Sequence, residues 1–267
     1  MIRTLKYLNL IFFLLMIVIN AIANLMPLGI GKTGDISGKY PNLFTPAPIT
    51  FSIWGIIYIL IAIFTVYQMA LFGDKTLAHY IIGLIGPWFI ISCAMNIACI
   101  FRWHYDIIWL STIFMVGLLF SLIVITMKFC PYHLEQTAKV TSMPILAKIG
   151  AIGFDVYLGW ICVATVANIS VLLVKLGWNR FGLSEQFWTV VAIAVSTLLG
   201  VLFIITKYKY MSAAAIIWAF CGILIKHISS SGHAGKYPLI ITVTIIGIVI
   251  ILCTGITKCI LRPSSAD

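Results

Sequence analysis

The chain has 267 residues, of which 62% are hydrophobic and only 9% are charged, and its formal net charge at pH 7 is +10. Soluble domains carry about 25% charged residues, so this composition excludes a single water-soluble domain. The basic residues stand singly or in pairs at the ends of apolar runs, where membrane topology explains them better than a nucleic-acid partner.

Apolar runs long enough to cross a bilayer recur along the whole chain. A spanning helix needs roughly 20 mostly apolar residues, and lipid offers no water to the backbone, so each run is expected to be a helix. The sequence therefore predicts an all-α fold, a polytopic membrane helix bundle with about eight transmembrane helices. Their ranges are 7–28, 50–72, 79–101, 106–128, 149–174, 187–206, 210–228 and 238–259.

The first of these runs has two interpretations. Arg3 and Lys6, followed by an apolar stretch and Ala21-Ile22-Ala23, resemble a cleavable signal peptide. The apolar stretch continues to Leu28, which is long enough to span, so we predict a retained first helix. The distribution of lysine and arginine among the loops favours both termini in the cytoplasm, and a bacterial plasma membrane is the expected location.

The stretch KYPNLFTPAPITFSIWGIIY, residues 39–58, stiffens the approach to the second predicted helix. Pro46 and Pro48 favour extended backbone and delay the helix until after residue 48. Three aromatic residues then follow at steps of three and four, which places them on one helix face. They are Phe51, Trp54 and Tyr58. The stripe indicates a pocket wall beneath a stiff loop or, equally, an aromatic belt at the membrane interface.

A second stripe lies in the fifth predicted helix, in DVYLGWICVATVANIS. Its members are spaced three, four and four residues apart, and they are Tyr157, Trp160, Ala164 and Asn168. Asn168 falls well inside the apolar run, so its amide requires a partner from a facing helix, a water or a ligand. A hydrogen bond between helices would by itself explain this asparagine.

Together the two stripes resemble the translocator protein family, also called tryptophan-rich sensory proteins (TspO/MBR). PAPITFSIWGIIY is similar to the opening of that family's second helix, and YLGWICVATVAN is similar to its fifth. In the third predicted helix, CAMNIACIF places Asn96 where the family has an asparagine, whereas the following tryptophan position reads Cys99. The resemblance covers about residues 5–176. We therefore predict a TspO-like five-helix unit over residues 1–176 and a three-helix extension over residues 177–267.

The resemblance implies a cavity between the helices, closed by the first loop, that binds a planar apolar ligand for sensing or transport. Haem, a porphyrin or a sterol would be such a ligand, and no cofactor is required beyond it. Aromatic faces suit flat ligands, and a few polar groups fix their orientation. The implied binding residues are Pro46, Phe51, Trp54, Tyr58, Asn96, Tyr157, Trp160, Ala164 and Asn168. The expected partners are the lipid bilayer and this small apolar ligand, and a homodimer is left open.

Two other functions stay open, a small-solute transporter and a light-dependent porphyrin-degrading enzyme. The aromatic faces carry no acid–base pair, which counts against ordinary catalysis, so a binding protein is favoured over an enzyme. Asp155 lies in the fifth helix about 200° around from Tyr157. It is interpreted as the partner of a lysine or, alternatively, as part of a proton path. His227 and His233 border a predicted loop without a nearby acid or cysteine, so we expect solvated histidines and no metal site.

Overall fold

The structure is a computed structural model that describes residues 2–26, 28–31, 33–69, 75–130, 143–207 and 209–261. Its long helices confirm the predicted all-α membrane bundle. They are α1 (Ile2–Leu25), α3 (Ile53–Gln68), α4 (Lys75–Ile85), α5 (Trp88–His104), α6 (Ile108–Lys128), α8 (Ile145–Lys175), α9 (Glu185–Lys207), α10 (Tyr210–Ile228) and α11 (Pro238–Ile260). The short elements of the connections are α2 (Thr33–Lys39) and the 3₁₀ turns η1 (Pro48–Ser52) and η2 (Arg180–Gly182).

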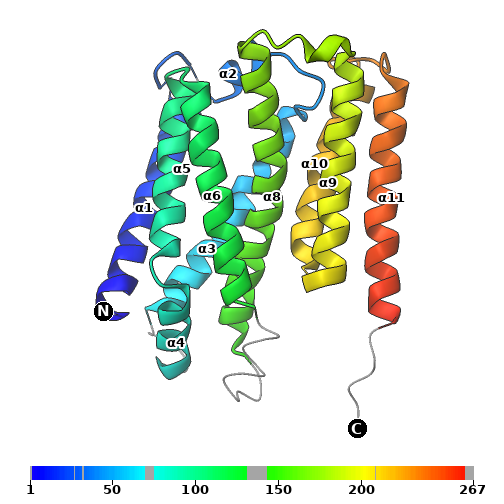
Figure 1. The fold of residues 1–267 in the computed structure, drawn as a ribbon. Coiled ribbons are helices and arrows are strands. Elements are labelled where there is room, and N and C mark those ends of the chain that lie inside the picture. Colours follow the sequence, from blue (N-terminus) through cyan, green and yellow to red (C-terminus); the bar gives the residue numbers. More distant parts are fainter. Residues whose placement is uncertain are drawn as a thin grey trace.

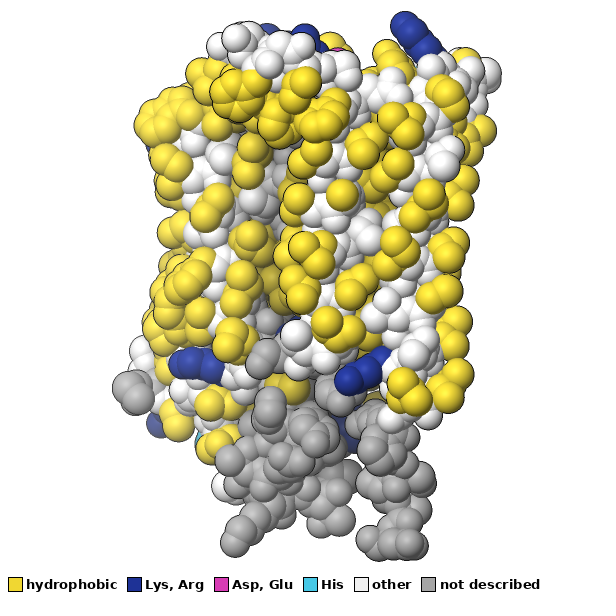
Figure 2. Space-filling view, turned by 45° about the vertical axis from the view of Figure 1, so that its right-hand side comes forward, with side chains coloured by type: hydrophobic (Ala, Val, Ile, Leu, Met, Phe, Trp, Pro, Cys, Tyr) yellow, Lys and Arg dark blue, Asp and Glu magenta, His cyan; other side chains and the backbone are white. Residues whose placement is uncertain are grey.

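Among the described residues, 7 helices are long and apolar enough to cross a membrane. Apolar side chains cover the middle of the molecule, whereas lysine and arginine side chains lie near its two ends (Figure 2). This distribution matches a bilayer, whose centre excludes charge and whose surfaces accept it. The predicted ranges agree with the helices within a few residues. The second predicted span extends over residues 70–72, which lie outside the described residues.

The third predicted span, 79–101, is not one straight helix. α4 and α5 meet at an angle of 56°, with the break at Gly86 and Pro87. Gly86 has a φ of +59°, a left-handed conformation that ends a helix and that glycine adopts without strain. Pro87 then cannot donate a backbone hydrogen bond and its ring obstructs the preceding turn. The expectation of a continuous helix is corrected, and this span is a bent pair.

α8 is the central helix of the bundle. Its 31 residues extend about 46 Å, and it lies between the group of α1, α5 and α6 and the group of α9, α10 and α11 (Figure 1). Two glycines allow α3 to approach α8, because Gly150 faces Phe64 and Gly153 faces Leu60. On the other side, a Cβ added at Gly159 would lie 2.1 Å from a carbonyl oxygen of α10. Helix α8 therefore contacts both groups at close range.

One buried apolar cluster extends from Phe13 in α1 to Ile251 in α11. The parts predicted as separate units, residues 1–176 and 177–267, thus share a core, and the division into units stays a prediction. The beginning of α1 and the end of α11 lie at the same end of the bundle (Figure 1). The assignment of both termini to the cytoplasm also stays a prediction.

Candidate ligand-binding site

The aromatic residues of the two stripes meet between η1, α3 and α8. The ring centroids of Trp54 and Trp160 lie 6.3 Å apart, and Phe51 approaches Trp160 edge to face at 5.7 Å. Tyr58 stacks on Trp54 at 5.5 Å, and Tyr157 meets the same indole edge to face at 5.5 Å. Stacked and edge-to-face pairs are favoured arrangements of aromatic rings. The two stripes therefore form one aromatic cluster between the helices.

A cavity of about 340 Å³ lies against this cluster. Its size is within the range of roughly 300–1,000 Å³ that is usual for small-molecule sites. Most of the predicted binding residues line it, and these are Pro46, Phe51, Trp54, Trp160, Ala164 and Asn168. The helix face predicted from the three–four spacing is thus the face that borders the cavity.

Three predicted binding residues are not among the residues that line the cavity, and they contact lining residues instead. Tyr58 and Tyr157 support Trp54 through the ring contacts described above. Asn96 is buried and accepts a hydrogen bond of 2.7 Å from Asn20 Nδ2, while its own Nδ2 donates to the Tyr157 hydroxyl at 2.9 Å. These bonds join α1, α5 and α8. Asn96 and both tyrosines therefore stand where they hold the cavity wall in position.

Asn168 combines both roles considered for it. It lines the cavity, and its Oδ1 accepts a hydrogen bond of 2.5 Å from Thr112 in α6. Its Nδ2 lies 3.5 Å from the hydroxyl oxygen of Ser111, and this long distance indicates a weak hydrogen bond. The amide is thus oriented by a facing helix and keeps a donor with capacity for a further acceptor.

Several cavity residues were absent from the sequence-based set. Asn20 and Asn24 reach the cavity from α1, and Trp103 and Met115 reach it from α5 and α6. Two asparagines four residues apart in an apolar helix share a face. That spacing could have indicated from the sequence that α1 contributes polar groups to the cavity. Cys99, at the position where the resemblance expects tryptophan, lines the cavity too, and Trp103 follows one turn later.

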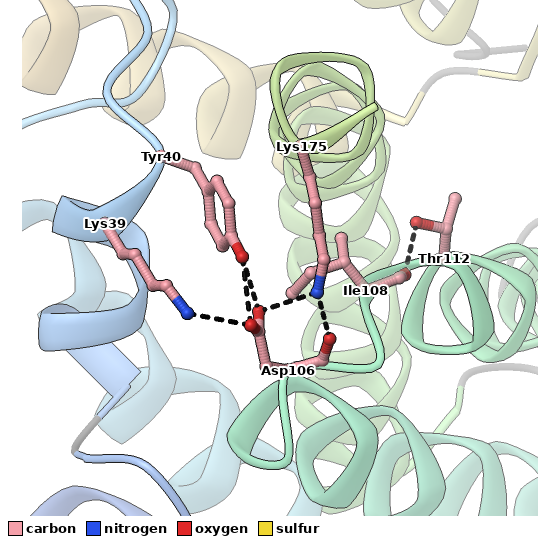
Figure 3. A network of polar contacts seen from close by, with 6 residues as sticks. All are labelled: Lys39, Tyr40, Asp106, Ile108, Thr112 and Lys175. Carbon is pink, nitrogen blue, oxygen red and sulfur yellow. Dashed lines mark hydrogen bonds and ion pairs between the residues drawn. The ribbon is translucent and has the colours of Figure 1, made fainter. Parts of the chain in front are cut away.

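The connection between α2 and η1, together with the first three residues of η1, forms a lid, which we define as residues 40–50. Asp106, in the turn between α5 and α6, fixes the beginning of this lid (Figure 3). Lys39 Nζ lies 2.8 Å from Asp106 Oδ2, the Tyr40 hydroxyl donates to Asp106 Oδ1 at 2.8 Å, and Lys175 Nζ lies 3.0 Å from Oδ1. Lys175 also donates to the backbone carbonyl of Asp106.

The electrostatics of Asp106 follow from these neighbours. Burial of the carboxylate acts to raise its pKa, but the hydrogen bonds from Lys39, Tyr40 and Lys175 outweigh burial and lower the pKa of Asp106 to about 2. Asp106 also has a φ of +58°, which an aspartate tolerates better than most residues. A single carboxylate thus joins the lid to the ends of α5 and α8.

The histidines near the connection between α10 and α11 differ from the expectation that both are solvated. His227 is 0% exposed, and its Nε2 lies 2.9 Å from the carbonyl oxygen of Leu43 in the lid. Its ring stands 4.6 Å from that of His233. The prediction of solvated histidines is wrong for His227, because the lid covers this end of α10 and no local sequence pattern reports that contact.

Asp155 meets a lysine from the C-terminal helices. Its Oδ1 lies 2.5 Å from Nζ of Lys209, which precedes α10. Lys209 also donates to the carbonyl oxygen of Thr126 at 3.1 Å, and the Ser212 hydroxyl donates to the Asp155 carbonyl oxygen at 2.8 Å. The pair joins α6, α8 and α10, and a proton path through it stays a prediction.

A larger cavity, of about 460 Å³, lies near η2 and the beginning of α9. Among the described residues that line it, none belongs to the two aromatic stripes, and its rim includes the exposed Asn179 and Arg180. The smaller cavity lies inside the bundle, against rings from two helices, and carries inward-facing amides. We therefore take the smaller cavity as the candidate site.

The fold and this cavity define a polytopic α-helical membrane protein with an aromatic-walled internal site. The chain belongs to the family described as TSPO-like protein, whose family model matches residues 6–257. The match includes α9, α10 and most of α11, which corrects the expectation that the resemblance ends near residue 176. Comparison with curated proteins and with solved structures gave no match.

Proposed function

We propose that the protein binds a planar, mostly apolar ligand of tetrapyrrole or sterol type in the cavity beneath the lid, for sensing or transport. The observation that carries this proposal is the position of Trp54 and Trp160, whose rings line one cavity from two different helices. Indole faces bind flat apolar ligands by stacking and by burial of apolar surface.

The polar groups of the lining fit such a ligand. No lysine, arginine, aspartate or glutamate is among the described residues that border the cavity, whereas Asn20, Asn24 and Asn168 are. The indole Nε1 of Trp160 is buried, and the described part of the chain offers it no acceptor. The Asn168 amide, which keeps a donor with capacity for a further acceptor, would donate to a carbonyl or carboxylate oxygen on the ligand.

The lid supports binding through its stiffness. Pro46 and Pro48 line the cavity and fix their own backbone torsions. A segment that is already ordered loses little conformational entropy when a ligand binds beneath it. The prolines therefore favour binding without contributing a polar contact.

Titration of the protein in lipid nanodiscs with protoporphyrin IX, followed by absorbance, tests the proposal. We expect saturable binding that Trp160→Ala weakens about fivefold to thirtyfold, because loss of an aromatic contact with its buried area costs about 1–2 kcal/mol. Trp109→Ala is the matched control, since Trp109 is 57% exposed on the outer face of α6 and should leave binding unchanged. Non-saturable uptake, or equal losses in both variants, would reject a specific site.

A further inference from the structure

The part of the lid that follows Asn42 is held by the C-terminal helices. The backbone N–H of Leu43 donates to Glu185 Oε1 at 2.9 Å, at the beginning of α9. The carbonyl oxygen of the same residue accepts from His227 Nε2 of α10 at 2.9 Å. Both polar backbone groups of Leu43 are therefore bound by side chains more than 140 positions later in the chain.

Two further bonds continue this attachment toward η1. The backbone N–H of Ala47 donates to the carbonyl oxygen of Gly222 at 3.0 Å, and the Trp218 indole N–H donates to the carbonyl oxygen of Thr50 at 2.8 Å. The approach of the lid to α10 is close at this point. A Cβ added at Gly222 would lie 1.9 Å from Thr50 Oγ1.

The lid thus has two faces with different neighbours. Thr45, Pro46 and Pro48 border the cavity. Leu43 and Ala47 are bonded to α9 and α10 on the other side, and the extended backbone at Ala47, with φ −60° and ψ 147°, permits this alternation. A displacement of the lid along the bundle axis, which would uncover the cavity, would break the bonds to α9 and α10.

We propose that α9 and α10 act as a clamp that holds the lid over the cavity and thereby sets the rate at which a bound ligand leaves. The clamp residues are Glu185, Trp218, Gly222 and His227. They are positioning residues, because they bind the lid backbone and none of them lines the cavity among the described residues. The part of this inference that concerns ligand release rests on the proposed function.

The experiment uses the full chain in nanodiscs and measures two quantities. Hydrogen–deuterium exchange reports the lid amides of Leu43 and Ala47 without any ligand, and stopped-flow dilution reports the dissociation rate of protoporphyrin IX. Gly222→Ala forces the lid away from α10. Gly83→Ala is the matched control, because it is also a helical glycine and its added Cβ would meet only one atom, 3.9 Å away.

We expect exchange of both amides and porphyrin dissociation to be at least tenfold faster in Gly222→Ala and unchanged in Gly83→Ala. Trp218→Phe, which keeps a ring but removes one hydrogen bond, should accelerate both about threefold and serves if Gly222→Ala does not fold.

Unchanged exchange in the folded variants would overturn the clamp. Faster exchange with unchanged dissociation would overturn its control of release. A wild-type protein that binds no porphyrin rejects a tetrapyrrole as the ligand of the proposed function instead, while exchange still decides whether α9 and α10 hold the lid.

Discussion

Two ion-pair clusters of similar composition stand in different surroundings. At Asp106, the carboxylate is 21% exposed and its two lysines, Lys39 and Lys175, are 51% and 32% exposed. At Asp155, the carboxylate is 19% exposed, but Lys209 is only 6% exposed. Exposed pairs contribute little because water and salt screen them, whereas a buried charge that loses its partner is strongly destabilising. The two ion-pair clusters are therefore expected to differ in how much the loss of one partner lowers the free energy of unfolding.

The clusters also join different parts of the molecule. Asp106 attaches the beginning of the lid to the ends of α5 and α8, where charges are accessible to water. Lys209 and Asp155 attach α10, one of the two clamp helices, to α8 inside the bundle. The comparison teaches that the clamp is fixed to the bundle by a buried pair, whereas the lid is attached by a screened one.

The largest expected effect comes from breaking the buried pair. Lys209→Met leaves Asp155 without its lysine, and we expect the free energy of unfolding to fall by about 3–5 kcal/mol. Chemical unfolding in detergent, followed by circular dichroism, measures this change. The double variant Lys209→Met with Asp155→Leu should recover most of the loss, because no unpaired charge remains. A double variant no more stable than the single one would contradict this account.

A smaller effect is expected at Asp106, and it depends on pH. The pKa of Asp106 is lowered to about 2 from a usual value of 3.8, so its stabilising contribution is complete above pH 3.8 and is lost as the pH falls through 2. We expect Asp106→Asn to cost about 1 kcal/mol at pH 7. The difference from wild type should fall to a small fraction of its pH 7 value near pH 2 and shrink in 1 M salt. Unfolding curves from pH 7 to pH 2 test this, and a constant difference would disagree.

The smallest effect is expected for Lys39→Met, the matched substitution for Lys209→Met. Lys39 is half exposed, and Asp106 keeps Lys175 and Tyr40 as partners after its loss. We therefore expect the smallest loss of stability of the three single variants, measured in the same unfolding experiment. Equal losses for the two lysine variants would remove the distinction between the clusters.

The sequence predicts the spans and the aromatic faces because both depend on local spacing. Apolar length defines the helices, and steps of three and four place Trp54 and Trp160 toward one cavity. The break inside 79–101 was also readable, since Pro87 stands in the middle of that run. A criterion based on apolar length takes no account of the effect of proline on a helix, so the predicted helix included Pro87.

The remaining features depend on contacts between distant residues. Asp155 and Lys209 are 54 positions apart, and Leu43 and His227 are 184 positions apart. No periodic pattern within one helix reports such a pairing. The last three helices lack a distinctive polar or aromatic spacing, which is why the sequence resemblance was expected to end near residue 176 although the family model continues to residue 257.

The unequal lengths of α8 and α10 have a consequence for the surrounding bilayer. Asp155 lies ten residues after the beginning of α8, about 15 Å along its axis, and the lower ends of α9 and α10 stop short of that of α8 (Figure 1). A bilayer thick enough to cover α8 would submerge Lys209. Hydrophobic mismatch of this kind draws headgroups and water inward on one side, so the membrane should be thinnest beneath the lower ends of α9 and α10.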